Sequence, residues 1–145
     1  MAKILLVDDE PAILKIFQLL LSTEGHDVRI TESGEEAVGI VEQGNIDLLI
    51  SDVRMSPTDG FEVLRRVREA QANIPVIMLS AYHTKDSAEM ASRLGAFGFI
   101  EKPPDTKQLI KLVNEALAGC GAKDGGKLSQ PGDRELRSIP HMPDE

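Results

Sequence analysis

The side chains best suited to chemistry stand at the ends of short apolar runs in this sequence. Asp8 and Asp9 follow the first run, Asp52 follows the third, Ser80 ends the fourth, and Lys102 comes just after the fifth. In an open sheet of parallel strands, ligands bind beyond the carboxyl ends of the strands, where the strand order reverses. If the runs are such strands, three carboxylates, one hydroxyl and one ammonium group converge on one edge of the sheet.

A cluster of this kind has a definite chemistry. Three neighbouring carboxylates repel one another and raise each other's pKa values. One Mg²⁺ ion and the ammonium of Lys102 balance the three aspartates, since −3 is offset by +2 and +1. Mg²⁺ binds carboxylates, a carbonyl oxygen and several waters, which leaves a coordination position for a phosphoryl oxygen. The pattern therefore predicts phosphoryl transfer, with Asp52 attacking phosphorus to form an acyl phosphate.

Five apolar runs are the strands that would position this cluster. Three of them are nearly continuous Ile, Leu and Val, which is typical of parallel strands covered on both faces. The second run alternates, as expected of an edge strand. The expected strands are Lys3–Val7, Asp27–Thr31, Asp47–Ser51, Pro75–Ser80 and Gly98–Glu101.

Helical patterns fill the gaps between the runs, with apolar residues three and four positions apart. Pro11 suits a first helical turn and Gly25 a helix end, and Ser33 with Glu36 forms the sequence pattern of a capping box. The expected helices are Pro11 to Gly25, Ser33–Val41, Asp59–Ala72, Asp86–Leu94 and Thr106–Leu117. Strand and helix alternate five times, which favours an α/β layered domain with right-handed crossovers.

Composition narrows the class of protein. The chain has 145 residues and a net charge of −8, so direct nucleic acid binding is not expected, because such binding requires basic surface. Cys120 is the only cysteine, which excludes an internal disulfide and a thiolate metal cluster. No apolar stretch is long enough to cross a bilayer and no leader pattern precedes the first run. We therefore expect a cytoplasmic protein without a membrane partner.

Residues 119–145 differ from the rest of the chain. Five Gly and three Pro occupy 8 of these 27 positions, and the segment contains no Phe, Trp or Tyr. Such a composition cannot bury a core. We expect a flexible tail or linker at 119–145, after one domain at 1–118.

The order and spacing of the motifs resemble those of response regulator receiver domains, the phosphoacceptors of two-component signalling. The resemblance runs from Lys3 to about Leu117, with 28 residues from Asp52 to Ser80 and 22 from Ser80 to Lys102. Its motifs are Asp8-Asp9, Asp52 within Ser51-Asp52-Val53-Arg54-Met55, Gly60, Ser80-Ala81 and Lys102-Pro103. The family implies a doubly wound five-stranded parallel sheet of order 2-1-3-4-5 with five flanking helices, a flavodoxin-like α/β fold.

The resemblance also implies a metal site. Asp52 is the expected phosphoacceptor and a ligand of Mg²⁺, for which Mn²⁺ can substitute. Asp9 is expected to bind the ion directly, Asp8 largely through water, and Arg54 through its backbone carbonyl. One departure lies beside this site, because Ser56 intervenes in Met55-Ser56-Pro57 where the family commonly has Met-Pro.

Three further residues are expected to respond to phosphorylation. By resemblance, Lys102 bridges to the phosphoryl group and Ser80 bonds one of its oxygens. Phe99 occupies the aromatic switch position and is expected to turn inward as Ser80 moves. The Lys102-Pro103 peptide is expected to be cis.

The implied function is that of a signalling switch rather than a metabolic enzyme. A histidine kinase or phosphotransfer protein is the expected donor, and the domain itself is expected to carry self-phosphorylation and self-dephosphorylation chemistry. The switched state is expected to act on a partner or effector, and a homodimer through the last two helices and the fifth strand is a further expectation. The sequence does not identify the kinase or the output.

Plainer interpretations and rival classes stay open at this point. Ser80 could be a turn former, Lys102 a solvated charge and Phe99 a core residue. An aspartyl phosphatase or phosphomutase needs a second Asp two residues after its nucleophile, where this chain has Arg54. A flavin-binding electron carrier needs a loop rich in Ser, Thr and Gly where this chain has Asp8-Asp9-Glu10-Pro11. A receiver that serves only as a binding module is the third alternative.

Overall fold

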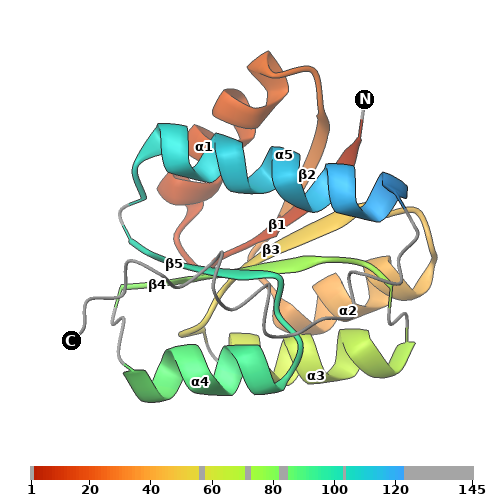
Figure 1. Cartoon of the computed structure of the whole chain (residues 1–145), viewed down its shortest axis with the longest axis vertical. Coiled ribbons are helices and arrows are strands. Elements are labelled where there is room, and N and C mark those ends of the chain that lie inside the picture. The colour runs from red at the N-terminus through yellow and green to blue at the C-terminus, as the bar shows by residue number, and fades with distance from the viewer. Residues whose placement is uncertain (1, 56–57, 71–72, 82–84, 103, 123–145) are drawn as a thin grey trace.

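Strands and helices alternate in the computed structural model, which describes residues 2–55, 58–70, 73–81, 85–102 and 104–122 (Figure 1). The strands are β1 (Lys3–Val7), β2 (Asp27–Thr31), β3 (Leu48–Asp52), β4 (Val76–Ser80) and β5 (Gly98–Glu101). The helices are α1 (Pro11–Thr23), α2 (Gly34–Glu42), α3 (Gly60–Ala70), α4 (Lys85–Arg93) and α5 (Thr106–Ala122). Every expected strand and helix is therefore present.

The strands form one parallel sheet in the order β2-β1-β3-β4-β5. Helices α1 and α5 cover one face of this sheet, and α2, α3 and α4 cover the other (Figure 1). The fold is the doubly wound, flavodoxin-like arrangement that the sequence predicted. The strand order reverses beside β1 and β3, so the carboxyl ends of these two strands border the crevice where such sheets bind ligands.

The strands are apolar along their length because both faces of the sheet are covered. Ile4 and Leu6 of β1 pack in the layer that contains α1 and α5, whereas Leu5 and Val7 pack in the layer of the other three helices. The same alternation continues in β3 and β4. Burial of aliphatic side chains on both faces is the main stabilisation of such a sheet, and it fixes the strand ends that carry the acidic residues.

The start of α2 differs in one respect from the predicted capping box. The Ser33 hydroxyl oxygen accepts a hydrogen bond from the Glu36 backbone N–H at 3.1 Å, as expected. The Ser33 N–H, however, donates to the Thr31 hydroxyl at 3.1 Å, and the Glu36 carboxylate accepts a hydrogen bond from that same hydroxyl. Half of the capping box forms, and Thr31 replaces the other half.

Helix α5 runs farther than the sequence predicted. It ends at Ala122, so it includes residues 119–122, which composition had assigned to the tail. Residues 123–145 lie outside the described part of the chain. Among the described helices, none combines the length and the apolar character needed to cross a membrane.

Candidate functional site

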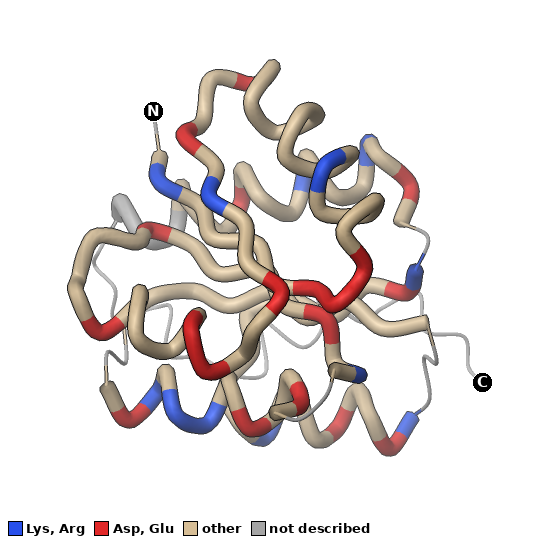
Figure 2. The backbone as a smooth tube through the Cα atoms, turned by 180° about the vertical axis from the view of Figure 1, so that it is seen from behind, with Lys and Arg blue, Asp and Glu red and all other residues tan. Residues whose placement is uncertain are grey.

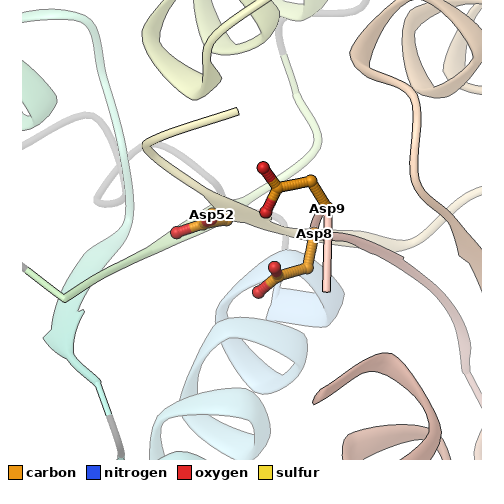
Figure 3. A group of neighbouring side chains, drawn as sticks. All are labelled: Asp8, Asp9 and Asp52. Atoms are coloured by element: carbon orange, nitrogen blue, oxygen red, sulfur yellow. The ribbon is translucent and has the colours of Figure 1, made fainter. Parts of the chain in front are cut away.

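The ends of β1 and β3 bring three aspartates together. Asp52 is the last residue of β3, and Asp8 and Asp9 directly follow β1. One carboxylate oxygen from each of the three lies within 4.8 Å of the others (Figure 3). Asp8 and Asp52 are only 2% and 4% exposed, whereas Asp9 is exposed. Figure 2 shows acidic segments meeting near the middle of the view, and the predicted cluster of carboxylates is present.

Lys102, directly after β5, brings a positive charge into this cluster. Its backbone N–H donates to the carbonyl oxygen of Ser80 at 2.7 Å, which ties it to the end of β4. Its Nζ lies 2.9 Å from Asp8 Oδ2 and 3.4 Å from Asp52 Oδ1. The structure therefore joins residues 94 positions apart in one buried ion-pair cluster.

Burial and like charges shift the protonation of this cluster. Burial raises the pKa of Asp52 to about 6, and the negative charge of Asp8 adds to the increase while Lys102 opposes it. Burial also raises the pKa of Asp8, against the opposing effect of its hydrogen bond from Lys102. For Lys102, burial is the largest single effect and would lower the pKa. The hydrogen bond and charge of Asp8, together with the charge of Asp52, outweigh it, so the pKa of Lys102 is raised.

Gly60 allows the start of α3 to approach the end of β3. A Cβ atom at Gly60 would overlap the carbonyl oxygen of Asp52 and lie 2.8 Å from Val53 Cα. The Gly60 N–H also donates to the Val53 carbonyl at 2.7 Å. Sequence reasoning recorded Gly60 only as a motif position, and the structure gives the reason for it.

The other predicted residues lie around the cluster. Ser80 ends β4 and is 1% exposed, and Phe99 in β5 is 1% exposed within the layer of α2, α3 and α4. Arg54 is exposed beside Asp9 in an open groove. The groove is lined by Asp9, Val53, Arg54, Met55, Asp59, Phe61 and Ser87. The switch role of Ser80 and Phe99, and the Arg54 carbonyl ligand, stay predictions.

Sequence reasoning missed one charged neighbour of Lys102. Glu10 Oε1 lies 3.7 Å from Lys102 Nζ, and its side chain is 62% exposed. The signal was present as a third acidic residue directly after Asp8 and Asp9. The predicted cis peptide before Pro103, and the departure at Ser56, lie outside the described residues.

Comparison of the sequence with models of known protein families identifies the family to which this chain belongs. The model of the response regulator receiver domain matches residues 4–114. The chain belongs to the response regulator receiver domain family. Receiver domains are phosphoacceptor modules of two-component signal transduction, which agrees with an aspartate cluster and a lysine at the carboxyl edge of the sheet. The family assignment also sets aside the phosphatase and flavin-carrier alternatives.

Similar proteins come from several bacteria. The transcriptional regulatory protein GlrR of Escherichia coli K12 is 38% identical over 116 residues, which is 80% of this chain and 26% of the relative. The DNA-binding transcriptional regulator NtrC of Bradyrhizobium is 38% identical over 138 residues, 94% of this chain and 28% of the relative. This receiver thus spans about a quarter of the length of these relatives. A receiver domain structure from Clostridium thermocellum is 32% identical, with a TM-score of 0.77 over 81% of this chain and 95% of that chain.

The donor set of this receiver fits the Mg²⁺ ion that such domains bind at an acidic site. Carboxylate oxygens are the ligands that Mg²⁺ prefers, and Asp8, Asp9 and Asp52 offer one each within 4.8 Å. The raised pKa values of Asp8 and Asp52 show that Lys102 alone does not compensate the buried negative charge. A divalent cation bound by these carboxylates would supply the missing positive charge.

Proposed function

We propose that Asp52 is the residue of this receiver that accepts the phosphoryl group. The observation that carries the proposal is a carboxylate 4% exposed at the end of β3, which lies 3.4 Å from the Lys102 ammonium and next to two further aspartates. A carboxylate in such a place is presented to a donor at the edge of the sheet, with positive charge already beside it. Electrostatic stabilisation and positioning of this kind are the main contributions of a protein to phosphoryl transfer.

The transfer itself is a displacement at phosphorus. A carboxylate oxygen of Asp52 forms a bond to phosphorus, while the bond from phosphorus to the donor's imidazole nitrogen breaks and its electron pair stays on that nitrogen. Lys102 balances charge on the transferred phosphoryl oxygens. Bound Mg²⁺, held by Asp9, Asp52, the Arg54 carbonyl and, through water, Asp8, would neutralise charge on the same oxygens. Mn²⁺ satisfies the same oxygen ligands.

The donor is a histidine kinase or a phosphotransfer protein, as the family relationship suggests. Hydrolysis of the acyl phosphate within the domain resets the state, and small phosphodonors can load it. Once Asp52 is phosphorylated, Ser80 moves to bond a phosphoryl oxygen. The Phe99 side chain changes conformation in response to the movement of Ser80. The signal leaves through α4, β5 and α5, to a partner, an effector or a second copy of the chain. We place the domain boundary at the end of α5, at Ala122, rather than at residue 118.

Intact mass spectrometry tests the acceptor directly. The wild type, incubated with acetyl phosphate and Mg²⁺, should gain one phosphoryl adduct, which a chelator should prevent. Asp52→Asn should gain none. Asp47→Asn is the matched control, because Asp47 is an exposed residue directly before β3, at the end away from the site, and its replacement should leave the adduct intact. An adduct that survives in Asp52→Asn would place the acceptor elsewhere.

A further inference from the structure

A third carboxylate competes for the lysine of the site. Lys102 Nζ lies 2.9 Å from Asp8, 3.4 Å from Asp52 and 3.7 Å from Glu10. The side chains of Asp8 and Asp52 are only 3% and 6% exposed, whereas that of Glu10 is 62% exposed. Glu10 is therefore the outermost of the three charges, on the side of Lys102 that solvent reaches.

The side chain of Glu10 has no evident part in building the fold. Glu10 is the N-cap residue of α1, in an extended conformation, and its side chain makes no cap hydrogen bond. Its backbone N–H donates to Asp8 Oδ1 at 3.0 Å, a bond that any non-proline residue at this position can make. An uncharged side chain of the same shape should therefore leave the structure as it is.

The charge of Glu10 changes the balance of the site. Four carboxylates contribute four negative charges, from Asp8, Asp9, Asp52 and Glu10. Lys102 and one divalent cation together supply three positive charges. The metal-bound site, before phosphorylation, therefore keeps one net negative charge. The contacts of 3.7 and 3.4 Å to one Nζ place Glu10 Oε1 and Asp52 Oδ1 no more than about 7 Å apart. A phosphoryl oxygen that contacts Lys102 Nζ at about 3 Å likewise lies no more than about 7 Å from Glu10 Oε1.

We propose that Glu10 is a specificity-determining residue, which disfavours small anionic phosphodonors at Asp52 in proportion to their charge. The inference rests on the proposed role of Asp52 as the acceptor. Glu10 gives the domain a means of resisting phosphorylation of Asp52 by free metabolites. A protein donor can overcome the repulsion, because it can place a cation or a hydrogen-bond donor against the exposed Glu10 carboxylate. Acetyl phosphate carries no such group.

Two small donors of different charge test the proposal. With acetyl phosphate, which carries two negative charges at neutral pH, an oxygen of Asp52 bonds to phosphorus, the P–O bond to the acetyl group breaks, and acetate leaves with the electron pair. With phosphoramidate, which carries one net negative charge because its nitrogen is protonated, the P–N bond breaks and ammonia leaves. The acceptor and the product are the same in both reactions.

The experiment compares phosphorylation rates of wild type, Glu10→Gln and Glu24→Gln at saturating Mg²⁺, followed by intact mass. Glu24→Gln is the matched control, since Glu24 is an exposed carboxylate at the other end of α1. At low ionic strength, removing one charge about 7 Å away in a water-like dielectric should raise the rate about sevenfold for acetyl phosphate and about threefold for phosphoramidate. At roughly 0.5 M salt both gains should fall below about twofold.

Equal rates for Glu10→Gln and wild type with both donors would overturn the inference, and so would equal gains for the two donors. If the wild type gains no adduct at all, the proposed function fails, and calorimetric titration with Mg²⁺ then tests Glu10 by itself. Glu10→Gln should bind Mg²⁺ more weakly than Glu24→Gln, because a negative charge near the site has been removed. Equal Mg²⁺ affinities would remove the electrostatic role assigned to Glu10.

Discussion

Replacing the proposed phosphoacceptor should make the metal-free protein more stable. Asp52 is 4% exposed, and burial together with the charge of Asp8 raises its pKa from 3.8 to about 6. A raised pKa means that the folded state binds the proton more tightly than the unfolded state does. The ionised carboxylate is therefore a cost to folding, and Asp52→Asn removes this cost because Asn is a neutral side chain of nearly the same shape.

The size of the effect follows from the shift. About two pKa units at 1.36 kcal/mol each correspond to about 3 kcal/mol of unfolding free energy. This value already includes the attraction of Lys102, which opposes the shift. The free energy of unfolding of the wild type should fall as the pH rises from about 4 to about 6 and should then stay level as far as Asp52 is concerned. Asp52→Asn should therefore match the wild type near pH 4 and exceed it by about 3 kcal/mol at pH 8.

Urea unfolding in the presence of a chelator, at pH 4 and at pH 8, measures both quantities. The chelator is needed because bound Mg²⁺ would stabilise the ionised carboxylate of the wild type. Asp27→Asn serves as the control, since it makes the same chemical change at an exposed position of β2. The control should show no comparable gain at either pH.

Two results would refute the reasoning. If Asp52→Asn were no more stable than the wild type at pH 8, the buried carboxylate would be compensated within the fold. If the gain were the same at pH 4 and pH 8, it would come from packing or hydrogen bonding rather than from the ionised charge.

Three further outcomes are expected. Gly60→Ala should lose about 1–3 kcal/mol of unfolding free energy, measured by urea unfolding, because the added Cβ would overlap the Asp52 carbonyl oxygen. The control Gly39→Ala in α2 should gain about 0.5–1 kcal/mol, because nothing lies within 4 Å of its added Cβ. Calorimetric Mg²⁺ affinity should fall as the pH drops through about 6, because protons then compete for Asp52; an affinity independent of pH would remove Asp52 from the metal site. Lys102→Gln should slow adduct formation with acetyl phosphate about 100-fold or more in intact mass measurements, whereas Lys111→Gln, an exposed change on α5, should not.

The sheet and the acidic cluster could be predicted from the sequence because both depend on strand patterns. Runs of Ile, Leu and Val without alternation indicated strands covered on both faces, and parallel strands end at the same edge. The structure therefore brings together, at the predicted edge of the sheet, the side chains of Asp8, Asp52 and Lys102, although Lys102 is 94 residues from Asp8.

Other features depend on which of several nearby groups forms a hydrogen bond, or on the conformations of long side chains. A sequence pattern does not encode either. Thr31 displaced Glu36 from the predicted capping box because its hydroxyl serves both Ser33 and Glu36. The Gly and Pro content of residues 119–145 suggested that the domain ends at residue 118, yet α5 continues to Ala122. A glycine costs a helix only about 1 kcal/mol, so Gly119 and Gly121 do not end it. The contact between Glu10 and Lys102 depends on the conformations of two long side chains.

The acidic site and the stability of the fold oppose one another in this receiver. A single lysine holds two buried aspartates whose pKa values remain raised, so the fold bears negative charge that it does not compensate by itself. The same deficit favours a divalent cation, and a bound cation would in turn favour the ionised form of Asp52 that attacks phosphorus. A second buried cationic side chain would leave Asp52 paired within the fold and less able to attack phosphorus. Glu10 adds one more negative charge at the exposed side, where it costs the fold little and acts only on what approaches.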